Sequence, residues 1–133
     1  MKRHFKTEIG GKKLKLSLSF GTSLDLLDEV GSPSQMLQDI ISESQARSQG
    51  KAVALDFRLT ERTATKLLVI ANASTEALDF KEMGELCFTQ GFIEVYGIVV
   101  DYLTEMISGG TSDGGELAKF VKEEGVETVD GKN

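Results

Sequence analysis

Residues 79–107 read DFKEMGELCFTQGFIEVYGIVVDYLTEMI, the longest stretch of this chain in which apolar side chains recur with a helical period. The recurring side chains, at steps of three and four residues, are Phe92, Val95, Val99, Tyr102, Leu103 and Met106. Such spacing is typical of an amphipathic helix. Asp79 followed by Glu82 has the spacing of a capping box, which predicts that a helix begins here. Gly91 costs about 1 kcal/mol relative to alanine inside a helix, so we expect a break near Gln90 and a second helix over Phe92–Ile107.

Composition and charge are those of a small acidic globular protein. The chain has 133 residues, of which 40% are hydrophobic and 27% charged, and its formal net charge is −6. This length suits one domain. The negative charge argues against non-specific binding to nucleic acid or to an anionic membrane surface. No run of about 20 apolar residues is present, so we expect no membrane span and no membrane partner.

The first part of the chain predicts a β-hairpin. Two runs, His4–Ile9 and Lys12–Phe20, are joined by a pair of glycines that accept positive φ angles. Apolar side chains alternate along the second run and are expected on its buried face: Leu14, Leu16, Leu18 and Phe20. The opposite face is rich in lysine, which suits an exposed sheet edge.

Three helices are predicted between the hairpin and residue 79. We expect a short helix with Leu24, Leu27 and Val30 facing inward, ended by Gly31. The second helix has Ser32 as N-cap, with Pro33 in its first turn and Gln35 completing a capping box. Its inward side chains are Met36, Leu37, Ile40 and Ile41, and we expect it to fray over residues 42–49 and to end at Gly50. The third helix has Thr60 as N-cap, runs to about Ala73 and carries an apolar row of Ala64, Leu67, Leu68 and Ala71.

Residues 51–59 leave two interpretations open. Val53, Leu55, Phe57 and Leu59 alternate with less apolar residues, which favours a strand or an extended segment over the core. A helical start at Ala52–Leu55 is the alternative.

The fold class expected from these elements is α+β, mostly α, with an N-terminal β-hairpin followed by about four to five helices and a flexible C-terminal tail. Residues 1–107 form the predicted globular domain. Residues 108–115 read SGGTSDGG and predict a flexible linker. In the tail up to residue 133, Leu117, Phe120 and Val121 have helical spacing, which predicts a disordered or partner-binding segment.

The sequence offers no set of residues suited to catalysis. His4 is the single histidine and has no carboxylate cluster near it in sequence, so a surface histidine is expected. Cys87 is the single cysteine, so no intrachain disulfide can form, and we expect a buried, inert thiol in a reducing compartment. One cysteine and one histidine do not make a zinc site, and we expect no cofactor and no enzymatic activity. The aromatic residues of the last two helices are expected in the core: Phe80, Phe88, Phe92, Tyr96 and Tyr102.

A protein without catalytic residues is expected to work by binding, through an exposed apolar surface. The candidate surfaces are the outer edge of the hairpin, the segment over residues 53–59, and the tail. The candidate partner-binding residues are Val53, Leu55, Phe57, Leu117, Phe120 and Val121.

The order of elements resembles that of phage tail assembly chaperones and the related tail proteins of gene-transfer agents. Residues 8–31, EIGGKKLKLSLSFGTSLDLLDEVG, are similar to the opening of those proteins, where a hairpin runs into a helix near a Gly-Thr pair. Here the pair is Gly21 and Thr22, and Leu24 and Leu27 continue the pattern. Residues 86–107 are similar to their C-terminal apolar helix, which follows a glycine.

The resemblance implies a non-enzymatic assembly chaperone for phage tail morphogenesis. Such a protein binds the tape measure protein, recruits tail tube subunits, and self-associates, with rings or spirals as expected forms. It acts in the host cell cytoplasm and is not in the mature virion. Two other functions stay open: a structural virion protein of the tail or head-tail junction, and a host-directed regulator whose acidic surface imitates nucleic acid. The last requires acidic residues gathered on one face, and here they are spread along the chain.

Overall fold

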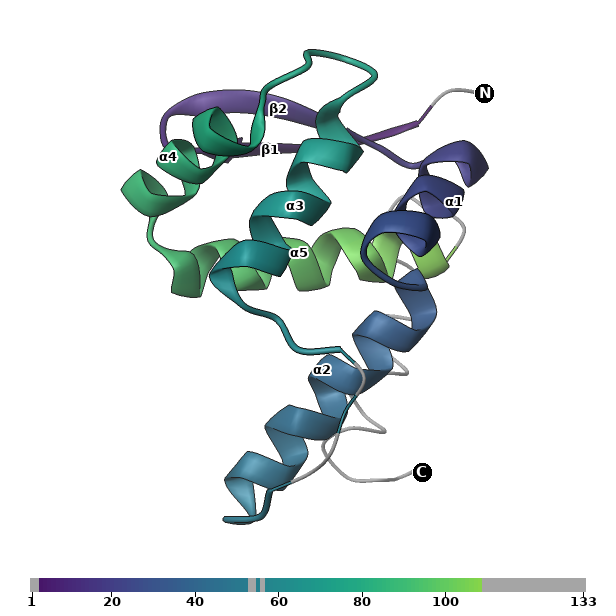
Figure 1. Ribbon diagram of the computed structural model, residues 1–133, viewed down its shortest axis with the longest axis vertical. Helices are drawn as coiled ribbons and strands as arrows, with labels where there is room; N and C mark the ends of the chain where they lie inside the picture. Colours follow the sequence, from purple (N-terminus) through teal and green to yellow (C-terminus); the bar gives the residue numbers. More distant parts are fainter. Residues whose placement is uncertain (1–2, 53–54, 56, 109–133) are drawn as a thin grey trace.

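The computed structural model of this protein describes residues 3–52, 55 and 57–108. In these residues a two-stranded antiparallel hairpin precedes five helices (Figure 1). The elements are β1 (His4–Ile9), β2 (Lys12–Ser17), α1 (Phe20–Glu29), α2 (Pro33–Ser48), α3 (Glu61–Asn72), α4 (Phe80–Gln90) and α5 (Phe92–Ile107). The fold class predicted from the sequence, α+β and mostly α, is therefore confirmed.

The hairpin closes through a turn that only glycine fits easily. Gly10 and Gly11 have φ angles of 61° and 84°, the left-handed region that a two-residue hairpin turn requires. The register pairs Ile9 with Lys12 and His4 with Ser17. The second strand ends at Ser17, so the expectation that it continues to Phe20 with that ring buried is wrong. Phe20 is the first residue of α1, and 77% of its surface is exposed.

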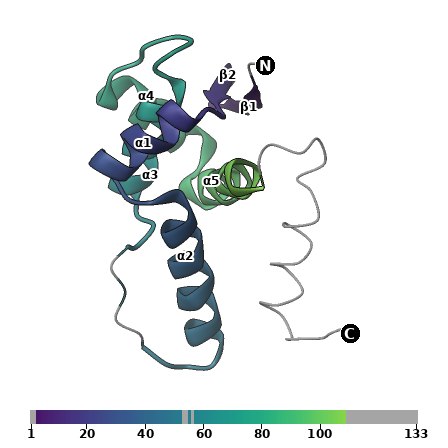
Figure 2. The same ribbon diagram turned by 90° about the vertical axis from the view of Figure 1, so that its right-hand side faces the viewer.

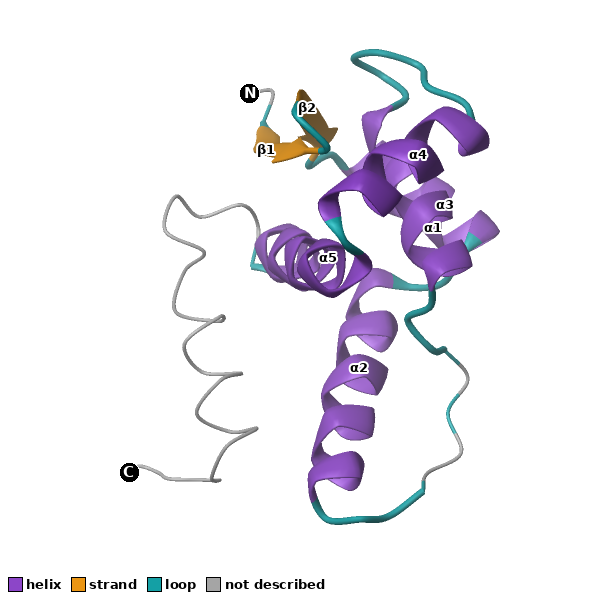
Figure 3. Ribbon diagram, turned by 90° about the vertical axis from the view of Figure 1, so that its left-hand side faces the viewer, coloured by secondary structure: helices purple, strands orange, loops and turns teal. Residues whose placement is uncertain are grey.

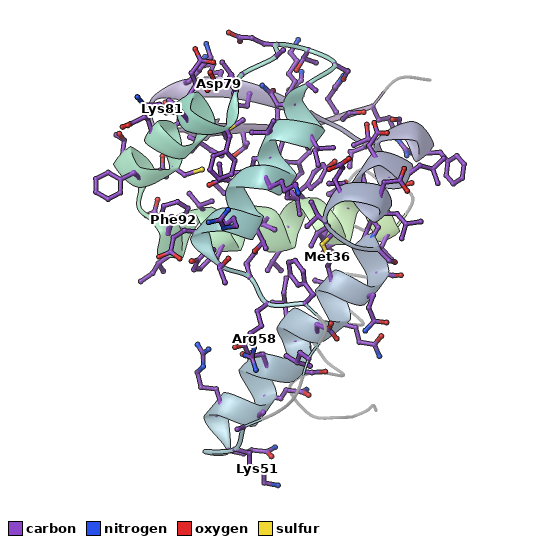
Figure 4. All side chains as sticks on the ribbon, viewed as in Figure 1. Met36, Lys51, Arg58, Asp79, Lys81 and Phe92 are labelled. Carbon is purple, nitrogen blue, oxygen red and sulfur yellow. The ribbon has the colours of Figure 1, made fainter. Side chains whose placement is uncertain are left out.

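The helices pack beneath the hairpin around α3 and α5. Figure 1 shows α5 running under the two strands, with α3 crossing between α4 and α1. Figure 2 shows α2 leaving the other elements and extending to the far end of the molecule. Met36, near the start of α2, points into the core, whereas Lys51 lies beyond its far end (Figure 4).

One core joins all seven elements. Side chains with no exposed surface come from each of them: Ile9, Leu16, Leu26, Met36, Ala64, Leu67, Leu68, Ala71, Met83, Cys87, Val95, Val99, Tyr102 and Leu103. The whole apolar row predicted for α3 lies in this set, as do Val95, Val99, Tyr102 and Leu103 of the row predicted for α5. The other two members of the α5 row, Phe92 and Met106, are partly buried against the core. The burial of these core side chains is the main favourable term that holds the helices together.

Helix α2 differs from its prediction in two respects. The Ser32 hydroxyl caps the helix by accepting the N–H of Gln35, but the Gln35 side chain does not complete a capping box. Its Nε2 instead donates to Oδ1 of Asp39 at 2.9 Å, one turn further along. The expected fraying is also wrong, because α2 stays helical to Ser48. An ion pair of 3.0 Å between Glu43 and Arg47 supports this polar part, since the two residues are one turn apart.

The segment between α2 and α3 is neither a helix nor a strand in its described residues, 51–52, 55 and 57–60. Phe57 is 7% exposed and joins the core. Its backbone N–H donates to Oδ2 of Asp39 at 3.1 Å. In a sheet this N–H would donate to a carbonyl of the neighbouring strand. Here the buried carboxylate of Asp39 on α2 accepts it instead.

The break predicted near Gln90 is confirmed. Helix α4 begins with a full capping box between Asp79 and Glu82, and it ends at Gly91, whose φ is 100°. The chain then turns by 111° into α5, a corner visible in Figure 3. Among the described helices none is by itself long and apolar enough to cross a membrane, and α4 and α5 meet that criterion only when taken as one bent pair.

Candidate functional site

The partner-binding residues predicted from the sequence are only partly placed by the structure. Val53, Leu117, Phe120 and Val121 lie outside the described residues, and Leu55 is half-buried. Phe57 is a core residue, held by its backbone bond to the buried Asp39. Phe57 therefore offers little exposed surface in this structure, and its role in partner binding stays a prediction.

Cys87, on α4, is buried as predicted, and its side chain has no exposed surface. Burial raises the pKa of the Cys87 thiol, and a hydrogen bond with Thr65 opposes this only in part. The thiol is therefore held in its protonated, weakly nucleophilic form. Within residues 3–52, 55 and 57–108, no three His, Cys, Asp or Glu side chains are grouped as metal ligands would be.

Helix α1 presents a row of large apolar side chains to solvent. Phe20, Leu24 and Leu27 are 77%, 42% and 52% exposed, and we call these three residues the α1 stripe. Their spacing of four and three residues places them on one side of the helix. On the inward side Leu26 is fully buried. The expectation that Leu24 and Leu27 face the core is therefore wrong, because the helix is turned by about a third of a revolution from the predicted orientation.

A chain of hydroxyl groups explains this orientation. Ser17 Oγ donates to Ser19 Oγ at 3.1 Å, and Ser19 Oγ donates to Thr22 Oγ1 at 3.0 Å. Ser19 is also the N-cap, since its Oγ accepts the N–H of Thr22 at 3.1 Å. Thr22 is thereby held on the inward side, at 8% exposure. Leu26 follows Thr22 by one turn and is therefore buried with it, while the α1 stripe is left outside.

The α1 stripe lies beside exposed carboxylates. Helix α1 contains Asp25, Asp28 and Glu29 and no basic residue. Glu29 lies 3.8 Å from the ammonium of Lys66, whereas no ion pair to Asp25 or Asp28 occurs in the described part of the chain. An apolar row next to unpaired negative charge favours a partner segment that is apolar on one side and basic beside it.

A second apolar surface lies at the bend between α4 and α5. Phe88 and Ile93, on either side of Gly91, are 77% and 86% exposed, and we call this pair the α4–α5 corner. Phe80 is 49% exposed. The prediction that Phe80 and Phe88 are core residues is wrong, whereas Tyr102 is fully buried as predicted. Figure 1 shows α4 and α1 on opposite sides of the molecule, so the two apolar surfaces are well separated.

Searches against known protein families, curated proteins and solved structures gave no match. The likeness to phage tail assembly chaperones therefore stays a prediction from the sequence pattern.

The sequence contains a signal for the α1 stripe that its first interpretation passed over. Two rows with helical spacing overlap between residues 20 and 30: one is Phe20, Leu24 and Leu27, the other Thr22, Leu26 and Val30. The first row is the more apolar, and apolarity alone assigns it to the core. The serines at positions 17 and 19 favour the second, because they supply hydrogen-bond partners for Thr22.

Proposed function

We propose that this protein is a non-enzymatic assembly chaperone of phage tail morphogenesis, which binds the tape measure protein and recruits tail tube subunits. The observation that supports this most is the α1 stripe, three large apolar side chains exposed on one helix. Exposed apolar rows of this kind favour helical partners, because an amphipathic helix presents a matching row. The order of a hairpin followed by helices also agrees with the resemblance described above.

The chemistry of the α1 stripe suits a chaperone for a long helical protein. A tape measure protein exposes apolar rows along its length before assembly, and these rows aggregate unless they are covered. The α1 stripe covers such a row, and the exposed carboxylates of Asp25 and Asp28 keep the covered complex charged. The α4–α5 corner lies on the other side of the molecule and stays available for a second protein, such as a tail tube subunit.

Co-expression with the tape measure protein tests the proposal. With the wild-type chain in excess, we expect the tape measure protein in the soluble fraction and co-purification of the two proteins. Replacing the α1 stripe by serine (Phe20→Ser, Leu24→Ser and Leu27→Ser together) should return the tape measure protein to the pellet. Phe88→Ser with Ile93→Ser is the matched control, because it removes exposed apolar surface elsewhere and should leave the tape measure protein soluble. A tape measure protein that stays insoluble beside excess wild type contradicts the proposal.

Mass spectrometry of purified virions distinguishes the proposal from the structural alternative. A chaperone leaves the tail when assembly ends, so its peptides should be absent from the particles. Peptides present in a fixed ratio to the tail tube protein would instead identify a structural virion protein of the tail or head-tail junction.

A further inference from the structure

In the part of the chain that the structure describes, no strand pairs with the outer edge of β1. The two-residue turn makes Ile9 and Lys12 a hydrogen-bonded pair, and such pairs alternate along an antiparallel ladder. Lys6 and Glu8 therefore point their backbone N–H and C=O groups away from β2. The N–H of Leu18 donates to the carbonyl of Arg3, which continues the same alternation beyond the strands.

The two edges of the hairpin are not alike. On β2, the outward carbonyl of Lys15 accepts from the Thr75 hydroxyl at 3.0 Å, and that of Ser17 accepts from the Tyr102 phenol at 2.6 Å. On β1, no hydrogen bond from the described residues reaches the outward backbone groups of Lys6 or Glu8. Figure 3 shows the reason: β2 lies on the side of α3 and α4, and β1 lies on the outer side of the hairpin.

We propose that the edge of β1 binds β1 of a second copy of this chain, antiparallel and centred on Thr7. The four strands then form one sheet in the order β2, β1, β1 of the second copy, β2 of the second copy. The arrangement is isologous, because each copy supplies the same strand to a two-fold axis. It gives the outward groups of Lys6 and Glu8 backbone partners in both copies.

The charges of β1 select this register among the possible ones. Only residues with outward backbone groups can face each other as hydrogen-bonded pairs, so His4, Lys6 and Glu8 must meet among themselves. Centring on Phe5 places Lys6 opposite His4 and brings no carboxylate to Lys6. A two-fold axis through Lys6 places the two Lys6 side chains opposite each other, and an axis through Glu8 does the same with the two Glu8 side chains. Both arrangements pair like charges, which is destabilising. Centring on Thr7 places Lys6 opposite Glu8 of the second copy, twice over. When two copies of Lys6-Thr7-Glu8 run antiparallel, each lysine therefore faces a glutamate.

The charges within the hairpin favour the same pairing. Lys6 and Glu8 are both exposed on the outer face, and Lys6 lies opposite Lys15 of β2. This pair of like charges gains a carboxylate neighbour when Glu8 of the second copy takes its place beside Lys6. The β1 edge, which carries one lysine and one glutamate on its exposed face, therefore accepts its own sequence.

Charge exchange tests the proposal in the full-length chain. The wild type should form a dimer in sedimentation velocity experiments as its concentration rises. Lys6→Glu and Glu8→Lys should each weaken the dimer by about tenfold or more, since each replaces both attractive pairs by repulsive ones. A mixture of the two variants should form a heterodimer, and the double variant should regain the homodimer. Lys81→Glu, an equal change of charge on α4, should leave dimerisation unchanged.

Cross-linking tests the register. Thr7→Cys places two thiols in a non-hydrogen-bonded pair, with Cα atoms about 4.5 Å apart, within the range of a disulfide. Oxidation should give a covalent dimer with this variant and not with Lys6→Cys, whose thiol faces Glu8 of the second copy. A wild type that stays monomeric at the highest attainable concentration overturns the proposal. So does a mixture of Lys6→Glu and Glu8→Lys that fails to associate.

Discussion

The side-chain carbonyl of Gln90 accepts a hydrogen bond of 2.9 Å from the backbone N–H of Gly10, 80 residues earlier in the chain. This bond joins the turn of the hairpin to the end of α4, directly before the bend at Gly91. The turn lies so close to α4 that a Cβ added to Gly10 would be 2.7 Å from the carbonyl oxygen of Leu86. The hairpin is therefore fixed to α4 through backbone contact.

Replacing Gly10 by alanine should destabilise the protein far more than the same change at Gly11. Both residues have positive φ angles, so each substitution costs about 1–2 kcal/mol of backbone strain. Only Gly10→Ala adds a clash with Leu86, because no atom lies within 4 Å of a Cβ at Gly11. Urea unfolding of the two variants measures the difference. Equal losses of stability would contradict the close approach of the turn to α4.

Alanine substitutions in α1 test which face of the helix is buried. Leu26→Ala should cost about 2–5 kcal/mol of unfolding free energy, because its side chain is fully enclosed. Leu27→Ala should change stability by no more than about 0.5 kcal/mol, since half of that residue is exposed. Chemical denaturation of both variants distinguishes the two faces. A larger loss for Leu27→Ala would restore the orientation that the apolar pattern alone predicts.

The buried phenol of Tyr102 should make stability depend on pH in alkaline solution. Burial raises the pKa of Tyr102 well above its usual value, and the phenol donates to the carbonyl of Ser17. Below pH about 10 the phenol is neutral in both states and its contribution is complete. As pH rises further, the unfolded chain loses this proton while the folded protein keeps it, so the free energy of unfolding falls.

Tyr102→Phe is the matching variant. It should lose about 1–2 kcal/mol at neutral pH, because the Ser17 carbonyl is left without its donor. The difference in stability between wild type and variant should shrink above pH about 10. Thermal unfolding between pH 7 and pH 11 checks this, and a difference that stays constant would exclude a buried, neutral phenol.

Cys87 should react with thiol reagents only when the protein unfolds. Its side chain is fully enclosed and burial raises its pKa, so both access and the thiolate population are reduced. Labelling with an aromatic disulfide reagent at pH 8 should be slow in buffer and immediate in denaturant. Rapid labelling of the native protein would show that α4 opens readily.

Elements with one strong apolar row could be predicted from the sequence. In α3 and α5 the buried residues follow a single row, and the N-caps Thr60 and Asp79 were both predicted, Asp79 together with its partner Glu82. The glycine pair of the hairpin and the break at Gly91 follow from backbone conformations that other residues avoid. These features depend on residues near each other in sequence, which is why local patterns suffice.

Features that depend on specific hydrogen bonds, or on how helices are placed, could not be predicted from the apolar pattern. The orientation of α1 follows from hydroxyl groups in the preceding segment, and burial of Phe57 follows from Asp39 on α2. The exposure of Phe88 and Ile93 follows from the direction of the bend at Gly91, which no local pattern encodes. The α4–α5 corner therefore became visible only in three dimensions, whereas the α1 stripe had a signal in the sequence that apolarity alone outweighs.

The position of α5 in the chain has a consequence for biosynthesis. A ribosome finishes β2 long before it makes α5, and Tyr102 follows its acceptor Ser17 by 85 residues. Until α5 leaves the exit tunnel, Leu16 and Ile9 have no complete cover, so the nascent hairpin stays exposed to proteases and to other nascent chains. Translation that stops early therefore releases a fragment that cellular quality control can recognise and remove.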